Sequence, residues 1–422
     1  MHLKFLHTAD LHLDTPFKGL GEWNPWLAGK LKNATFKSFS RITDLAISEN
    51  VDFVLIAGDV FDSENMSLAA QLKFVAELRK LSENGINSYF ICGNHDHLTS
   101  WDRGLSLPSG TVRFDSSEVR KITHYRKGEA VADIYGISYQ NSYVKEDLSL
   151  KYHKTGSAAP FSIALLHGMA DIAGKDERYA PFSVKNILEK SFDYWALGHV
   201  HKRRILNEDP PVVYPGNPQG RDFGETGKKG CYIVEMETGR KPVLSFTALQ
   251  YVRFEEIELD ITGHEDVTVV TDLIDQEIDA LMSSDRNTGF IFRVLLTGRT
   301  GLHRSFNIPG EARQLAEELN SRYPEGDLVS WIDSIELMTR PPVDPDSLKE
   351  AGDFTAALIR SIERYEEDRE LIKVILEKLT NELPRARIIR ETGQLSESES
   401  YEILERSKWM LLDRLAGDRQ DD

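Results

Sequence analysis

Short apolar runs of strand length recur along the first half of the chain, and five of them end in a polar cluster. The runs are residues 3–7, 53–57, 89–92, 161–166 and 194–197. Two stretches between the first three runs, 33–49 and 67–83, carry apolar residues at helical spacing. Ser67 can cap the second of these helices, and Gly85 follows its end. The alternation of strand and helix predicts an α/β layer.

Later in the first 250 residues, the pattern changes to strands with no helix between them. These expected strands are residues 112–114, 119–123, 132–136, 203–206, 212–214, 230–236 and 243–249. The polar stretch 141–160 resembles a surface loop. We therefore expect the first domain, residues 1–250, to contain two sheets with helices outside them.

The rest of the chain predicts two further parts. Residues 251–340 alternate strand (252–259), helix (265–282), strand (290–296), helix (309–322) and strand (331–338), which indicates a small α+β domain. A proline-rich linker follows at 341–345. Apolar residues at helical spacing then predict one helix over about 346–383 and a second that begins at a capping box, Ser396 with Glu399. We expect residues 341–422 to form a linker and a helical hairpin.

The five polar clusters contain side chains that bind metal ions. In an open α/β sheet, residues just past the carboxyl ends of the strands line the ligand crevice. The candidate ligands are Asp10, His12, Asp59, Asn94, His167, His199 and His201. Oxygen and imidazole donors without thiolate favour manganese, iron or zinc in a reactive site over a structural zinc site. If one carboxylate is shared, these side chains fill four positions on each of two ions, and Asp59 is the natural bridge.

Each cluster has an ordinary structural explanation when it is considered alone. Asp-x-His can be a turn or a helix cap, Gly-Asp a tight turn, and His167 a buried core histidine. All five occur together and in order, and two ions about 3.5–4 Å apart are the arrangement of metal-assisted phosphoester hydrolysis. His95 adjoins a candidate ligand and is the candidate general acid, and Asp62 could orient its ring.

Composition limits the class of protein. The 422-residue chain has no apolar run long enough to cross a membrane, and we expect no cleaved signal peptide because a strand begins at once. Two cysteines argue against a disulfide framework and for the cytoplasm. The net charge of −17 is uneven, with 30 acidic and 30 basic residues in 1–249, 18 and 8 in 250–343, and 20 and 13 in 344–422. This excess of acid argues against nonspecific coating of DNA.

The clusters resemble a known pattern. D-x-H, G-D-x-x-D, G-N-H-[DE], H and G-H-x-H, in this order, are similar to the calcineurin-like metallophosphoesterase superfamily. Tyr214-Pro215-Gly216-Asn217-Pro218, followed by a Gly-Cys strand, narrows the resemblance to SbcD-type DNA-repair exonucleases and their YhaO-like branch. The resemblance implies an α/β/β/α sandwich with metals at one edge, a capping domain, and a helical end that binds the coiled coil of an SMC-like ATPase.

By the same resemblance, one ion takes Asp10, His12, Asp59 and His201, and the other takes Asp59, Asn94, His167 and His199. We expect manganese, with iron or zinc as alternatives. The function that follows is a 3′-to-5′ DNA exonuclease. A phosphodiesterase or phosphatase for nucleotides or phosphoproteins and a non-enzymatic DNA-end tether are the alternatives, and dimerisation is left open. Arg221 and the neighbouring lysines and arginines could position phosphate, or they could be ordinary solvated charges.

Overall fold

The computed structural model describes residues 1–15, 17, 25–62, 66–101, 105–156, 159–170, 179–323, 326–342, 349, 356–357, 359–361 and 363. Contacts between residues divide the chain into two compact units. The first consists of Met1–Glu256, Met282–Phe292 and Tyr323–Asp333, and the second of Ile257–Leu281, Arg293–Arg322 and Ser334–Asp422.

Six strands form the first sheet, in the order β12-β11-β1-β2-β3-β4. Their bounds are β1 (His2–Thr8), β2 (Phe53–Ala57), β3 (Asn87–Ile91), β4 (Thr111–Arg113), β11 (Gly230–Glu237) and β12 (Val243–Ala248). Strands β1, β2 and β3 are parallel, so their carboxyl ends meet at one edge of the sheet. Every residue of β2 is buried, which suits a parallel strand covered on both faces.

The second sheet also has six strands, in the order β5-β6-β7-β8-β10-β9. Their bounds are β5 (Arg120–Arg126), β6 (Glu129–Gly136), β7 (Phe161–His167), β8 (Tyr194–Gly198), β9 (Arg204–Glu208) and β10 (Pro211–Tyr214). Strands β7 and β8 are parallel, and their last residues, His167 and Gly198, pair with each other. The candidate ligands of this sheet therefore leave it side by side.

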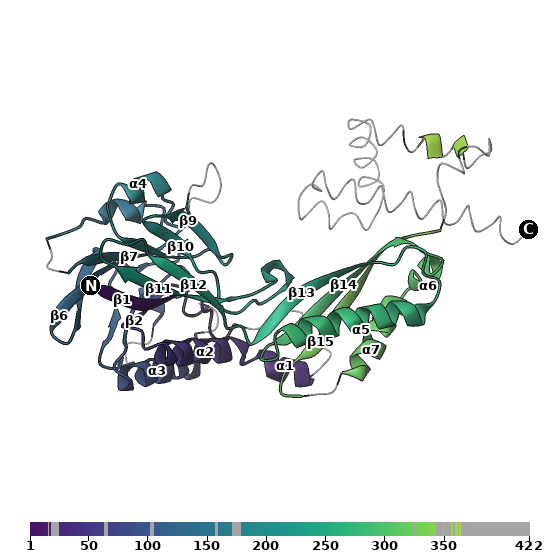
Figure 1. The fold of residues 1–422 in the computed structure, drawn as a ribbon, viewed down its shortest axis with the longest axis horizontal. Coiled ribbons are helices and arrows are strands. Elements are labelled where there is room, and N and C mark those ends of the chain that lie inside the picture. Colours follow the sequence, from purple (N-terminus) through teal and green to yellow (C-terminus); the bar gives the residue numbers. More distant parts are fainter. Residues whose placement is uncertain are drawn as a thin grey trace, which may run out of the picture. The chain divides into compact units, whose positions relative to one another are not determined.

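Two long helices cover the outer face of the first sheet (Figure 1). They are α2 (Ala34–Ser48) and α3 (Leu68–Glu83), and they confirm the helices predicted at 33–49 and 67–83. Ile42 and Phe74 pack in one apolar cluster with residues of β1, β2 and β3. The backbone N–H of Ala70 donates to Ser67 Oγ at 3.0 Å, which is the predicted cap. A shorter helix, α1 (Pro25–Leu31), was not predicted.

The two sheets pack face to face. Phe5 and Phe53 from the first sheet and Ile163 and Tyr194 from the second belong to one buried cluster. A further cluster covers the outer face of the second sheet with α4 (Val184–Leu188) and the 3₁₀ helix η3 (Leu148–Lys151). The order helix, sheet, sheet, helix confirms the predicted α/β/β/α sandwich.

The expectation of a surface loop at 141–160 was wrong in part. Tyr152 is fully buried in the outer cluster, its hydroxyl donates to the carbonyl of Leu165, and its ring lies 5.1 Å from that of Trp195. Tyr152 stands in a polar stretch without hydrophobic periodicity, which is why the sequence pattern did not show its burial.

Residues 252–340 contain a three-stranded sheet in the order β13-β14-β15. The elements are β13 (Val252–Asp260), α5 (Val267–Ser284), β14 (Gly289–Arg299), α6 (His303–Phe306), α7 (Glu311–Arg322) and β15 (Ser330–Arg340). The predicted alternation of strands and helices is confirmed, with α6 as an addition. The helices predicted after residue 345 lie outside the described residues, except for a few positions. Within the described part of the chain, no helix combines the length and apolar character needed to span a membrane.

Candidate metal centre

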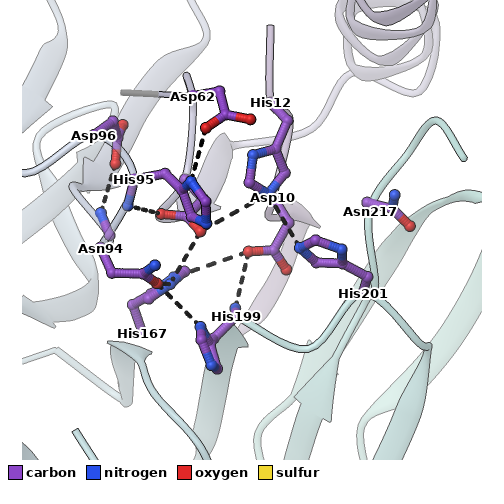
Figure 2. Close-up of polar contacts among 12 residues, drawn as sticks. Asp10, His12, Asp62, Asn94, His95, Asp96, His167, His199, His201 and Asn217 are labelled. Carbon is purple, nitrogen blue, oxygen red and sulfur yellow. Dashed lines mark hydrogen bonds and ion pairs between the residues drawn. The ribbon is translucent and has the colours of Figure 1, made fainter. Parts of the chain in front are cut away.

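One group of candidate ligands comes from the loops that follow β1 and β8. Asp10, His12 and His201 offer donor atoms within 4.8 Å of one another. His12 Nε2 and His201 Nε2 lie 3.0 Å apart, and Figure 2 shows the two rings facing each other across this short distance. Asp10 and His12 are buried, and His201 is partly buried. The loop after β8 thus brings His201 to the loop after β1.

A second group joins β2, β3, β7 and β8. Asp59, His167 and His199 form a second set of donor atoms within 4.8 Å. Asn94 Oδ1 lies 3.0 Å from His167 Nε2 and 3.1 Å from His199 Nδ1, so the amide oxygen faces the same space (Figure 2). All seven predicted ligands therefore lie at one edge of the sandwich.

Asp59 stands between the two groups. Its Oδ2 is 3.8 Å from His12 Nε2 and 3.4 Å from His167 Nε2. Its Oδ1 accepts the backbone N–H of His95 at 2.9 Å. One carboxylate oxygen is thus fixed by the backbone while the other faces both groups of donors, which is the position expected of a bridging ligand.

The backbone is strained at four of these residues. Asp10, His12, Asp59 and His199 have φ values of 52°, 42°, 49° and 99°. Positive φ is uncommon for residues other than glycine and costs on the order of 1–3 kcal/mol each. Backbone hydrogen bonds from Asp10 N to Gly58 O (3.0 Å) and from His12 N to Asp59 O (3.1 Å) hold the first two loops in this conformation. Such strain is typical of functional sites.

The donor atoms fit divalent cations. Among the described residues, Asp10 Oδ2 is buried and has no hydrogen-bond partner, and burial raises the pKa of Asp10 to about 6. Burial, followed by the charge of His167, lowers the pKa of His199 to about 3, so its ring is neutral and can donate a lone pair. The buried carboxylate oxygen has no partner, and the imidazole nitrogens face each other. A bound cation would supply the positive charge that both arrangements lack.

The pKa of His167 is also set by burial and by neighbouring charges, but here the charges dominate. Burial lowers the pKa of its imidazole, but the negative charges of Asp59 and Asp10 outweigh burial and raise it to about 9. Its Nδ1 lies 2.9 Å from the carbonyl oxygen of Ala57, which makes Nδ1 the hydrogen donor and directs Nε2 toward Asp59. A backbone carbonyl behind a histidine is the usual way to orient a metal ligand.

The predicted acid and its orienting carboxylate are adjacent to these groups. His95 Nδ1 lies 2.8 Å from Asp62 Oδ1, and the ring of His95 packs edge-on against that of His12 at 5.0 Å (Figure 2). The hydrogen bond to Asp62 raises the pKa of His95, and the same bond lowers the pKa of Asp62. His95 side chain is 40% exposed, so the ring can reach a bound substrate.

Asp96 and Trp101 hold the loop that carries His95. Asp96 accepts the backbone N–H groups of Gly93 at 2.6 Å and Val60 at 3.0 Å, and so ties the second and third loops together. Trp101 Nε1 donates to the carbonyl of Asp96 at 2.8 Å. Asp96 therefore supports the loop through hydrogen bonds and does not face the donor atoms as a ligand. Trp101 was not identified from the sequence.

Sequence reasoning also missed Glu225 and two tyrosines. Glu225 Oε1 lies 2.6 Å from His201 Nδ1. The ring of Tyr139 packs edge-on against His167 at 5.4 Å, and that of Tyr179 lies 4.8 Å from His199. A carboxylate shortly after a Gly- and Pro-rich turn was the one available signal for Glu225, and the tyrosines had none.

The basic residues around His201 fall into two sets. Arg221 and Lys229 point inward: Arg221 contacts Glu225, and Lys229 Nζ donates to the carbonyl of His201 at 3.2 Å. Lys202, Arg203 and Lys228 are exposed. The exposed set is available to a ligand, while the inward set supports the loop.

The sandwich fold and a rim of carboxylate, amide and imidazole donors define a metallophosphoesterase. A family model described as "Calcineurin-like phosphoesterase" matches residues 3–203, and one described as "Metallophosphoesterase YhaO, middle domain" matches residues 254–340. The chain belongs to the calcineurin-like metallophosphoesterase family, in its YhaO-like group, and this family uses divalent metal ions.

Similar proteins agree with this assignment. The chain is 37% identical over 280 residues to "Uncharacterized metallophosphoesterase YhaO" of Bacillus subtilis, covering 66% of this chain and 68% of that protein. It is 27% identical over 312 residues to "DNA double-strand break repair protein Mre11" of Sulfurisphaera tokodaii, covering 70% and 74%. The protein of the same name from Saccharolobus solfataricus is 28% identical over 253 residues, covering 58% and 62%.

Proposed function

We propose that this protein is a two-metal-dependent DNA phosphodiesterase that acts as a 3′-to-5′ exonuclease in DNA repair. The observation that carries the proposal is the placement of two groups of donor atoms on either side of Asp59, with the His95–Asp62 pair beside them. A bridging carboxylate suits two ions, and a separate imidazole suits proton transfer to a leaving group.

Asp10, His12, Asp59 and His201 would hold one ion, and Asp59, Asn94, His167 and His199 the other. We expect manganese, with iron or zinc as alternatives, because the donors are oxygen and imidazole. When bound, two such cations lower the pKa of water and stabilise the charge on phosphoryl oxygens.

The remaining chemistry belongs to His95. Hydrolysis of a phosphodiester releases a sugar oxygen that must gain a proton. Asp62 accepts the hydrogen of His95 Nδ1, which leaves Nε2 to deliver that proton, and the raised pKa of His95 favours the protonated ring. Transfer from a positioned acid typically contributes 10²–10⁴-fold to the rate.

DNA is the substrate that the relatives and the exposed charges support. Two of the similar proteins are described as DNA double-strand break repair proteins. Lys202, Arg203 and Lys228 place exposed positive charge near His201, where a phosphate backbone could bind. The total charge of −17 supports the alternative, which is hydrolysis of nucleotides or phosphoproteins.

A digestion panel in Mn²⁺ separates these substrates. The panel compares duplex DNA labelled at the 3′ end, the same DNA labelled at the 5′ end, a cyclic nucleotide and a phosphopeptide. We expect immediate release of the 3′ label and stepwise shortening of the 5′-labelled strand. Hydrolysis of the cyclic nucleotide or phosphopeptide with intact DNA would contradict the proposal.

A His95→Asn variant tests whether the protein is an enzyme or a DNA-end tether. It should bind Mn²⁺ as the wild type does and lose hydrolysis, with His97→Asn, two residues further along, as the matched control. If DNA processing in cells were unchanged by His95→Asn, the non-enzymatic alternative would hold.

The end of the chain is the proposed site of partner binding. We propose three domains, residues 1–250 for hydrolysis, 251–340 as a cap, and 341–422 as the segment that binds an SMC-like ATPase. The full chain should retain such an ATPase in a pull-down, and a chain ending at residue 343 should not. Equal retention by both chains would place the binding surface elsewhere.

We also propose that the protein forms a homodimer and is located in the cytoplasm. Leu68 and Leu72, one turn apart on α3, are 56% and 54% exposed, and such neighbouring apolar side chains suit a contact between copies. Both cysteines are free thiols, as expected in a reducing compartment. Light scattering of wild type and Leu72→Glu would show whether a dimer forms and depends on α3.

A further inference from the structure

Glu225 is buried against a metal ligand and has no role in the mechanism above. It lies at the end of the 3₁₀ helix η4 (Phe223–Glu225), and its side chain is 11% exposed. Its Oε1 is 2.6 Å from His201 Nδ1, on the side of the ring opposite to His12. A contact this short between a carboxylate and an imidazole nitrogen requires a hydrogen between them.

The turn that precedes Glu225 holds its carboxylate in place. Oε2 accepts from Asn217 Nδ2 at 2.8 Å and from the backbone N–H of Arg221 at 2.9 Å. Oε1 also accepts from Arg221 Nη2 at 3.1 Å. The same turn is tied to the ligand loop, because Asn217 N donates to the carbonyl of His201 at 3.3 Å. The position of the carboxylate is therefore set by several donors other than the histidine.

Two tautomers of His201 compete for this site. In one, Nδ1–H donates to Glu225, and Nε2 presents a lone pair toward His12 and Asp10. In the other, Nδ1 accepts from Arg221 Nη2, which is 3.1 Å away, and Nε2 carries the hydrogen. Only the first tautomer can bind a metal through Nε2.

We propose that Glu225 is a positioning residue that holds the Nδ1–H tautomer of His201 and thereby directs Nε2 at the metal. The inference rests on the proposed metal site. Arg221 makes the carboxylate necessary. If the carboxylate is removed, Arg221 Nη2 still faces Nδ1 and favours the tautomer that cannot bind a metal through Nε2. Carboxylates behind metal-binding histidines typically change metal affinity by 10–100-fold.

The test uses the full-length, metal-free protein labelled with ¹⁵N-histidine. Two-bond ¹H–¹⁵N correlations report which ring nitrogen carries the hydrogen, and His201→Gln identifies the signal. We expect the hydrogen on Nδ1 in the wild type and on Nε2 in Glu225→Leu. Calorimetric titration of the same proteins should then show Mn²⁺ affinity about 10–100-fold weaker for Glu225→Leu.

Two further variants separate orientation from packing. Glu225→Gln is isosteric, but Asn217 Nδ2 and the backbone N–H of Arg221 both donate to the Oε2 position, so the amide oxygen lies there and the NH2 group faces His201 Nδ1. It should therefore keep the packing and lose the Nδ1 hydrogen and the affinity, as Glu225→Leu does. Glu235→Leu removes the carboxylate of an exposed pair with His2 (3.4 Å) and should leave His201 and the Mn²⁺ affinity unchanged.

The proposal is overturned by a hydrogen on Nε2 in the wild type, by retention of the Nδ1 hydrogen in Glu225→Leu, or by unchanged Mn²⁺ affinity in that variant. Retention of the Nδ1 hydrogen and of wild-type affinity in Glu225→Gln also overturns it. If Glu225→Leu fails to fold, the wild-type tautomer still decides. A wild type that bound no Mn²⁺ would refute the proposed function, whereas the tautomer would still report on Glu225.

Discussion

Gly198 lies directly against the end of β2 at the candidate metal centre. It ends β8, and a Cβ built on it would lie 1.9 Å from the carbonyl oxygen of Ala57, at the end of β2. The same carbonyl accepts the Nδ1–H of His167 at 2.9 Å. Any side chain at residue 198 therefore pushes on the groups that position ligands from both sheets.

The size of the perturbation follows from these distances. Real Cβ contacts are essentially never shorter than 3.0 Å, so Gly198→Ala requires β2 and β8 to separate by about 1.1 Å, the difference between 1.9 and 3.0 Å. Overpacking of this kind costs about 1–3 kcal/mol of stability. Metal sites tolerate about 0.2 Å in ligand distance, and a misplacement of about 1 Å can lower a rate by about 10²-fold.

Calorimetry and hydrolysis assays measure both effects. We expect Gly198→Ala to unfold at lower temperature, to bind Mn²⁺ at least about 10-fold more weakly and to hydrolyse DNA about 10²-fold more slowly. Gly29→Ala is the matched control, because a Cβ on this glycine of α1 meets nothing within 4 Å. Affinity and rate within threefold of wild type, roughly 0.6 kcal/mol, would refute the reasoning.

Three other substitutions test the candidate acid, its orienting carboxylate and a buried histidine. His95→Asn should lower the rate of hydrolysis by about 10²–10⁴-fold. Asp62→Asn should move the alkaline fall in activity to lower pH, since Asp62 raises the pKa of His95. An unshifted pH profile would show that Asp62 does not act through His95. Burial lowers the pKa of His7 to about 3, below its ordinary 6.5, so its contribution to stability is present above pH 6.5 and is lost as pH falls toward 3. At pH 5 that loss is about 2 kcal/mol in the metal-free protein, and His7→Phe, which keeps the ring beside Tyr194, should remove this pH dependence in denaturant titrations; parallel curves for the two proteins would contradict it.

The sandwich could be predicted because its strands and helices carry regular periodicity. The run at residues 53–57 became β2 without change, and Ser67 caps α3 as its position before an apolar repeat indicated. The candidate ligands could be predicted because each lies at or shortly after the end of a strand, and parallel strands bring such positions to one edge. These residues could be identified without knowing how the two sheets pack against each other.

The contacts around those ligands could not be predicted in this way. Glu225 reaches His201 from a turn without periodicity, and Tyr152 is buried from a polar stretch. Trp101 supports Asp96 through one hydrogen bond to its carbonyl. Each of these contacts depends on how loops cross the edge of the sandwich, which hydrophobic patterning does not encode.

The most direct test of the central claim is an anomalous difference map from crystals grown with Mn²⁺. The account predicts two peaks about 3.5–4 Å apart on either side of Asp59. Asp10, His12 and His201 should surround one peak, and Asn94, His167 and His199 the other. A single peak, or peaks that Asp59 does not contact, would contradict it.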